Sequence, residues 1–156
     1  MKINKSIAHL KESIKINPDF YEAYNLIADI ILENGDSVEA ESWYTKSIYI
    51  MNKQISKLDQ KIDKSLKMNL FKEIKELQNK ISETFKDISC VYHKMGLISI
   101  HNNNNKLAIK RFEESIQTDK DNAESYFQLS KLTKGKKSTT YLNQAIDIDP
   151  EFSIQK

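Results

Sequence analysis

The sequence predicts an all-α protein, and three observations support that prediction. Glycine and proline are scarce, at three and two of 156 residues, so few positions interrupt a helix. Apolar residues recur three and four positions apart along most of the chain, which is the period of an α-helix. The two prolines lie in similar segments, SIKINPDF at 13–20 and AIDIDPEF at 145–152, and each is suited to end a helix. A repeated helical unit is therefore expected.

Composition excludes several classes of function. The 24 basic and 22 acidic residues give a net charge of +2, which predicts no polyanionic partner. Arg111 is the single arginine, so the forked contacts that favour nucleic-acid recognition are scarce, and we predict no nucleic-acid partner.

No apolar run approaches the roughly 20 residues that cross a bilayer, and we predict no membrane partner. The single cysteine cannot form an intrachain disulfide, and the first residues lack a secretory signal pattern, so a cytoplasmic location is predicted.

The segment after Pro18 shows alternating large and small side chains in two helical stretches separated by a turn. Small residues at fixed intervals let two helix backbones approach closely, and large residues fill the space beside them. The positions that carry this pattern are Tyr24, Ile27, Ala28 and Ile31 in the first helix, Gly35 in the turn, and Ala40, Tyr44 and Ser47 in the second helix. The pattern resembles the tetratricopeptide repeat, a unit of helix A, turn and helix B.

Further copies of the pattern follow along the chain. The second copy has Tyr92, Met95 and Gly96 in helix A, Asn102 to Asn105 in the turn, and Ala108, Phe112 and Ser115 in helix B. The third has Tyr126, Leu129 and Ser130, then Leu142, Ala145 and Pro150, with a shortened turn at Gly135. The first residues match helix B alone, at Ser6, Leu10, Ser13 and Pro18. The resemblance thus implies a half repeat at 1–20 and repeats at 21–54, 89–122 and 123–156, stacked as an α-solenoid.

Residues 53–88 separate two of these copies and carry isoleucine where a repeat needs small residues. Their apolar residues instead step by three and four in two runs, which is the spacing of a coiled coil. If the chain reverses between Asn69 and Leu70, the two runs fall into register, with Leu58 facing Ile81. We therefore predict that the repeats are interrupted by a long antiparallel coiled-coil hairpin.

A degenerate repeat over the same segment is the alternative. It would need helix breaks near 52–54 and 86–88. It would also need a second apolar face for stacking, for which the segment offers Leu66, Phe71 and Phe85. The hairpin needs no helix breaks, and one apolar stripe along each helix is enough to pack the two helices together.

The resemblance implies a binding function, since helix A faces of tetratricopeptide arrays line a concave groove that captures peptides or helices. We expect a scaffold or adaptor that binds a protein segment in this groove. The expected groove residues are Glu22, Asn25, Leu26, Asp29 and Glu33 from the first repeat, Cys90, His93, Lys94, Leu97 and His101 from the second, and Phe127, Gln128 and Lys131 from the third.

Charge narrows the expected ligand. Residues 1–52 carry 5 basic and 8 acidic residues, whereas 53–86 carry 9 and 5. Family members that grip chaperone C-terminal carboxylates use Lys and Asn on helix A, where this chain has Glu22 and Asp29. A carboxylate would be repelled, so we predict against that ligand and for a basic or amphipathic helix.

Two other classes of function stay open. The first is a structural subunit of a larger assembly that uses the hairpin arm and open repeat ends. The open ends also lead us to expect an excerpt of a longer protein, with end-to-end homodimerisation as the second choice. The second is an enzyme or metal protein. Cys90 and His93 lie one helical turn apart, but zinc usually takes four ligands, and no phosphate loop or nucleophile motif occurs. We therefore predict no enzyme, no cofactor and no metal site.

Overall fold

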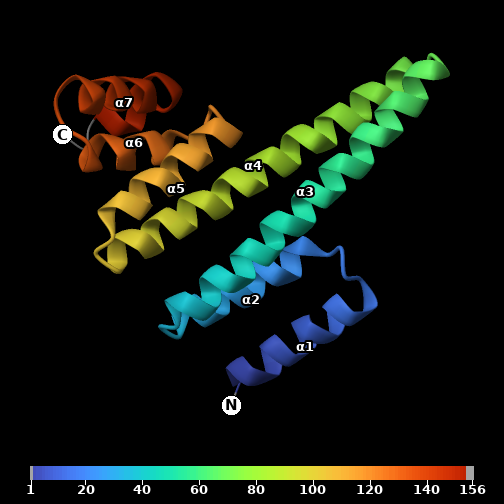
Figure 1. Ribbon diagram of the computed structural model, residues 1–156, viewed down its shortest axis with the longest axis horizontal. Helices are drawn as coiled ribbons and strands as arrows, with labels where there is room; N and C mark the ends of the chain where they lie inside the picture. The colour runs from blue at the N-terminus through green and yellow to red at the C-terminus, as the bar shows by residue number, and fades with distance from the viewer. Residues whose placement is uncertain (1, 154–156) are drawn as a thin grey trace. The chain divides into compact units, whose positions relative to one another are not determined.

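The computed structural model describes the backbone of residues 2–153 and the side chains of residues 5–153. The ends of the predicted first and last segments, residue 1 and residues 154–156, lie outside this range. Within it the chain forms seven α-helices and one 3₁₀ helix, without any strand (Figure 1). The predicted all-α fold is confirmed. The helices are α1 Lys2–Ile16, α2 Tyr21–Glu33, α3 Ser37–Lys67, α4 Phe71–His101, α5 Asn105–Thr118, α6 Ala123–Leu132 and α7 Gly135–Ile148, followed by η1 Pro150–Ser153.

The chain divides into two compact units between Thr84 and Phe85, inside α4. The first unit holds α1, α2, α3 and the beginning of α4. The second holds the remainder of α4 and everything after it. No helix in the described range is long and apolar enough to cross a bilayer.

The first unit has its core between α2 and α3, which pack as an antiparallel pair (Figure 1). Ala28 on α2 and Ala40 on α3 are fully buried, as are Tyr44 and Ser47. The tight turn between the two helices depends on Gly35, whose φ of +88° lies in the left-handed region that glycine adopts without strain. Asp36 then caps α3 by accepting a hydrogen bond from the Glu39 amide at 2.9 Å. The small residues predicted to sit between helices do so.

The second unit has a core around Phe112 on α5, which is fully buried with Ala108 and with Leu129 of α6. Gly96 on α4 lies so close to Phe112 that a Cβ added there would be 2.6 Å from the ring. Asn104 caps α5 and Asn122 caps α6, each accepting a backbone N–H. The last α-helix, α7, begins at Gly135, where the sequence predicts the shortened turn of the third repeat.

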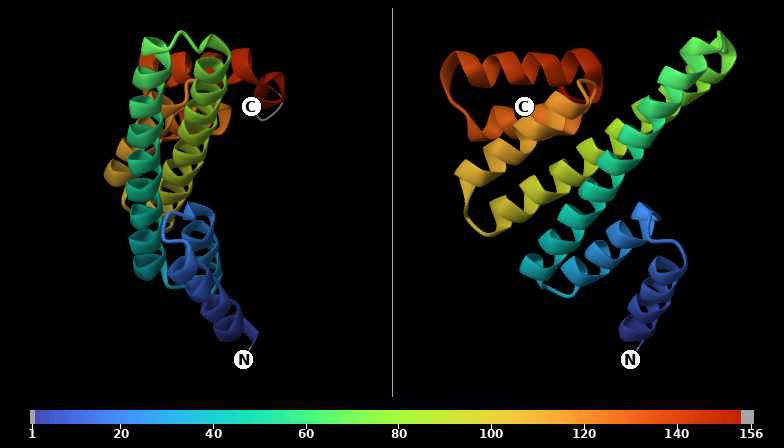
Figure 2. Two further views of the ribbon diagram at one scale, coloured as in Figure 1. Left: turned by 90° about the vertical axis from the view of Figure 1, so that its right-hand side faces the viewer. Right: turned by 45° about the vertical axis from the view of Figure 1, so that its right-hand side comes forward.

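Residues 53–88, the segment predicted to form a hairpin, fall within α3 and α4, two helices of 31 residues each (Figure 2). We call this segment the arm. Both helices run without interruption through 52–54 and 86–88, the places where a degenerate repeat would break. The chain reverses at Met68 to Leu70, with Asn69 at a φ of +56°. The coiled-coil register between the two helices stays a prediction.

Candidate interaction surfaces

The exposed side of α2 carries carboxylates around a leucine. Glu22, Leu26, Asp29 and Glu33 are spaced by four, three and four residues and therefore lie on one side of the helix, which we call the α2 face. Glu22 and Glu33 are exposed, and Leu26 is 48% exposed. The fifth residue predicted on this helix, Asn25, is half-buried, and within the described part of the chain its Oδ1 is buried without a hydrogen-bond partner.

The α2 face is fixed to the core through Asp29. The buried Tyr44 hydroxyl on α3 donates a hydrogen bond to the Asp29 carboxylate. Burial raises the pKa of Tyr44, and the Asp29 carboxylate raises it further. The phenol therefore stays protonated and keeps donating. As a result, the face cannot rotate relative to α3 without breaking a charge-assisted hydrogen bond.

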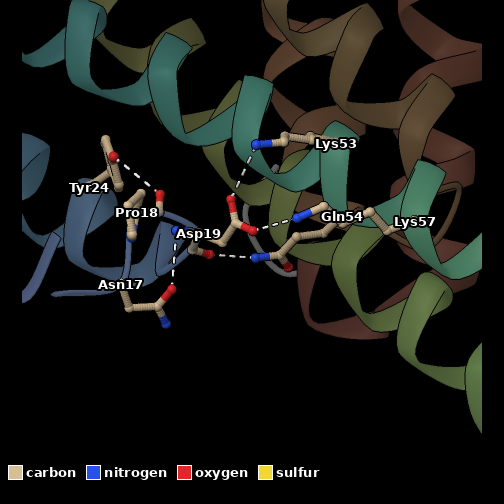
Figure 3. A network of polar contacts seen from close by, with 7 residues as sticks. All are labelled: Asn17, Pro18, Asp19, Tyr24, Lys53, Gln54 and Lys57. Carbon is tan, nitrogen blue, oxygen red and sulfur yellow. Dashed lines mark hydrogen bonds and ion pairs between the residues drawn. The ribbon is translucent and has the colours of Figure 1, made fainter. Parts of the chain in front are cut away.

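A second set of polar contacts holds the connection between α1 and α2 against α3 (Figure 3). The Asp19 carboxylate lies 2.6 Å from Lys57 Nζ and 3.6 Å from Lys53 Nζ, and Gln54 Nε2 donates to the Asp19 backbone carbonyl. The hydrogen bond from Lys57 is the main cause of a lowered Asp19 pKa, which partial burial opposes. Lys57 lies where α3 continues beyond residue 54, the predicted end of the repeat, so the helical extension helps to position α2. Sequence reasoning missed this cluster, because Asp19 and Lys57 are 38 positions apart.

In the second unit, four predicted residues share one side of α4. Cys90, Lys94, Leu97 and His101 have the same four, three and four spacing. Cys90 and His101 are exposed, Leu97 is 41% exposed, and Lys94 is half-buried. The structure therefore places these side chains together, around a leucine, as it does on α2.

The predicted residues on α6 behave less uniformly. Gln128 is half-buried and Lys131 is exposed, with its Nζ 3.9 Å from the centre of the Phe127 ring. Phe127 itself is only 6% exposed, because the Phe152 ring of η1 packs on it with centroids 4.7 Å apart. The prediction took Phe127 as a surface residue and did not foresee that η1 covers it.

His93 is connected to a chain of buried hydroxyl groups. Its Nδ1 lies 2.8 Å from Ser125 Oγ, and Ser125 Oγ donates to Ser115 Oγ at 2.8 Å. Ser115 Oγ donates to the Ser89 carbonyl at 2.9 Å, and Asn122 Nδ2 donates to Ser89 Oγ at 2.9 Å. All three serines are fully buried. The chain joins α4, α5 and α6.

Counting protons assigns the tautomer of His93. The single hydroxyl proton of Ser125 is donated to Ser115, so Ser125 Oγ must accept from His93. His93 therefore carries its proton on Nδ1, and Nε2 presents a lone pair. Burial lowers the His93 pKa, while the charge of Glu124 partly opposes this, so the neutral form dominates at pH 7.

The lowered pKa of His93 makes the stability of the fold depend on pH, with a definite sign. Because the folded pKa of His93 lies below the unfolded value of 6.5, the unfolded chain binds the proton more readily. The stabilisation is complete above pH 6.5 and is lost as the pH falls below it. We expect His93→Gln to flatten the fall in the urea-unfolding free energy between about pH 7 and pH 5. If His93→Gln left the change of unfolding free energy with pH unaltered, the lowered pKa of His93 would be contradicted. An NMR titration of the ring would measure the pKa directly.

The chemistry at Cys90 does not favour reactivity. Burial raises the pKa of its thiol, and the nearby Asp87, Glu124 and Asp119 carboxylates raise it further. Among the residues that the structure describes, no three His, Cys, Asp or Glu side chains gather where they could hold a metal ion.

Comparison with protein-family models supports the resemblance. Residues 9–42 match the family model described as tetratricopeptide repeat. No curated protein sequence matches the chain. Among solved structures, the chain is similar to MamA at 13% identity, with 97% of this chain and 91% of that chain covered and a TM-score of 0.41. It is also similar to YrrB, described as "a TPR protein with an unusual peptide-binding site", at 13% identity, 94% and 96% coverage and a TM-score of 0.38. PilF of Pseudomonas aeruginosa matches at 15% identity, 99% and 69% coverage and a TM-score of 0.38.

The family match begins in the second half of α1, includes all of α2 and ends in the first turns of α3. The matched segment therefore contains the fully buried Ala28 and Ala40. Residues 9–42 of this chain are thus similar to a tetratricopeptide repeat.

Proposed function

We propose that the chain is a non-enzymatic protein-interaction module that binds a basic, amphipathic helix on the α2 face. The tetratricopeptide match supports a role in binding proteins. The observation that carries the choice of ligand is an exposed leucine, Leu26, between the exposed carboxylates of Glu22 and Glu33. We also propose a cytoplasmic location.

The charge around the α2 face is one-sided. Residues 16–45 contain seven acidic residues and no lysine, arginine or histidine. Several of these carboxylates are already used inside the first unit: Asp19 by Lys57, Asp29 by Tyr44, and Asp36 by the α3 cap. Glu22 and Glu33 take part in no hydrogen bond or ion pair of the described residues. They are therefore available to lysines of a ligand, while Leu26 offers apolar contact.

In the same proposal, exposed residues of α4 and α6 in the second unit contact another part of the partner. Leu97 is exposed beside Lys94 and His101, and Gln128 and Lys131 lie on α6. These side chains carry positive or neutral groups, so this unit suits a different stretch of a partner from the one that binds α2.

A binding experiment tests the α2 assignment. The probe is a fluorescent helical peptide with lysines flanking a leucine stripe, and anisotropy measures its dissociation constant. Replacing both Glu22 and Glu33 by glutamine is expected to weaken binding about five- to tenfold, since exposed ion pairs contribute about 0.2–1 kcal/mol each. Raising the ionic strength from about 0.1 M to about 1 M should weaken the wild type in the same direction, because the Debye length falls from about 10 to 3 Å.

The control variant is Asp147→Asn with Glu151→Gln, which removes two exposed carboxylates from the second unit. It makes the same change in net charge and should leave the affinity within about twofold, because these charges lie outside the proposed contact. Equal weakening by both variants would mean that the peptide responds to net charge, and the α2 assignment would be wrong.

A further inference from the structure

The reversal between α3 and α4 exposes a cluster of large apolar side chains. We call residues 64–72 the arm tip. Met68 is 68% exposed and Phe71 is 72% exposed, and Leu66 and Leu70 are also exposed. Large apolar groups that gather at one end of a helical pair, instead of packing between its helices, indicate a binding surface.

The arm tip is a fixed structure. The Leu70 amide donates to the Ser65 carbonyl at 3.0 Å and the Asn69 amide donates to the Leu66 carbonyl at 3.1 Å, which closes the end of α3. Ser65 Oγ donates to the Glu73 carboxylate at 2.9 Å, which joins the two helices. A shallow pocket of about 600 Å³ lies beside the tip, lined by Asn69, Leu70, Phe71, Lys72, Glu73 and Glu76. The apolar side chains are thus presented by an ordered turn, so little conformational entropy is lost on binding.

The charges of the arm tip are also one-sided. Lys64, Lys67 and Lys72 fall within it, and it contains no acidic residue. Asp63 and Glu73 flank the tip on either side, and Glu73 already accepts the hydrogen bond of Ser65. The surface therefore has an apolar centre with positive charge around it, the reverse in sign of the α2 face.

We infer that the arm tip of one chain docks on the α2 face of a second copy. Phe71 and Met68 would contact Leu26, while tip lysines would pair with Glu22 and Glu33. This inference rests on the proposed function, since it names the ligand of the α2 face. The chain supplies both halves of the contact: an acidic, leucine-centred face in residues 16–45 and a basic, apolar tip in residues 64–72.

A single chain cannot make this contact with itself. Ser47 Oγ donates to the Tyr21 carbonyl at 3.3 Å, which places the beginning of α2 beside Ser47. From Ser47 to Lys67 α3 is unbroken, and about twenty residues of helix span about 30 Å. The tip therefore points away from its own α2 face. Because the two surfaces differ, two copies can exchange them reciprocally as a two-fold dimer, and otherwise the contact builds larger rings or open chains.

Analytical ultracentrifugation of the purified chain over a concentration series tests the inference. At an ionic strength of about 0.1 M the wild type should self-associate, and at about 1 M it should dissociate. The tip variant, Lys67→Glu with Lys72→Glu, should weaken association by about tenfold or more. The matched control, Lys134→Glu with Lys136→Glu, makes the same change of charge at exposed positions of the second unit and should leave association unchanged. Far-ultraviolet circular dichroism should show the same helix content in all variants.

A mixing experiment isolates the contact. The face variant, Glu22→Lys with Glu33→Lys, should fail to self-associate, because its face and its tip are both basic. The tip variant should fail as well, because both of its surfaces are acidic. Mixing the two variants in equal amounts should restore association, since each face then meets a tip of opposite charge.

Three results would overturn the inference. The first is a wild type that stays monomeric at every concentration at low salt. The second is an association that the face and tip variants do not weaken, which would place the contact elsewhere. The third is a monomeric wild type that sediments with phosphatidylserine vesicles through the same tip lysines, which would assign the tip to a lipid surface. If the chain stays monomeric but the lysine-rich peptide still binds the α2 face, the proposed function stands and this inference alone fails.

Discussion

Replacing Phe112 by alanine is expected to lower the free energy of unfolding by about 3–5 kcal/mol, the usual cost of emptying a buried phenylalanine site. Phe112 is fully buried, packs with Ala108 and Leu129, and lies against the backbone of α4 at Gly96. Removing its ring would leave a cavity among three helices of the second unit. Urea denaturation followed by circular dichroism measures the change, and a loss under about 1 kcal/mol would contradict the packing described.

The residue that faces Phe112, Gly96, gives a second test of the same packing. On an ordinary helix Gly→Ala stabilises by about 1 kcal/mol. At Gly96 the new Cβ would lie 2.6 Å from the Phe112 ring, so Gly96→Ala should instead destabilise, by about 1–3 kcal/mol. In the Phe112→Ala background the ring is absent, so the same Gly96→Ala change should become neutral or stabilising. Additive effects of the two changes would show that the two residues do not touch.

Replacing Ser115 by alanine should cost about 1–3 kcal/mol, although it removes a single oxygen atom. The change takes the acceptor away from the Ser125 hydroxyl in a fully buried place. The Ser89 carbonyl loses one of its donors but keeps the hydrogen bond of its own helix, because Ser89 lies inside α4. Each orphaned buried polar group costs about 1–3 kcal/mol. Urea denaturation measures the loss.

The matched control is Ser56→Ala, at an exposed position of α3, which should change the stability by about 0.5 kcal/mol or less. In Ser115→Ala the Ser125 hydroxyl is free to donate to His93 instead. The His93 ring should then favour the other tautomer, and its ¹⁵N chemical shifts would report this. A cost for Ser115→Ala as small as that of the control would mean that the buried hydroxyl chain does not form.

The packing of the helices could be predicted because it depends on local rules. Small residues at Ala28, Ala40 and Ala108 signal close approach of two backbones, and all three are fully buried. Gly35 and Gly135 have positive φ and mark helix boundaries, as their scarcity and position suggest. The exposed positions of α2 follow from helical spacing once these buried positions are known.

The long-range contacts could not be predicted in the same way. The ion pair of Asp19 with Lys57 depends on how α2 lies along α3, and nothing local to either residue specifies it. Phe127 has the spacing of a surface residue, yet Phe152 from a separate element covers it. The serines at 89, 115 and 125 look like ordinary small packing residues in the sequence. The hydrogen bonds between them form only when the three helices pack together.

The continuity of α3 constrains how this protein can vary in length. One helix carries both the repeat and the arm from Ser37 to Lys67, and each residue adds about 1.5 Å and about 100° of rotation. Losing a single residue from the arm would swing its end by about 100° around the helix axis relative to α2. Losing seven from each side would retract it while turning it by only about 20°. Homologues with shorter or longer arms should therefore differ by whole heptads.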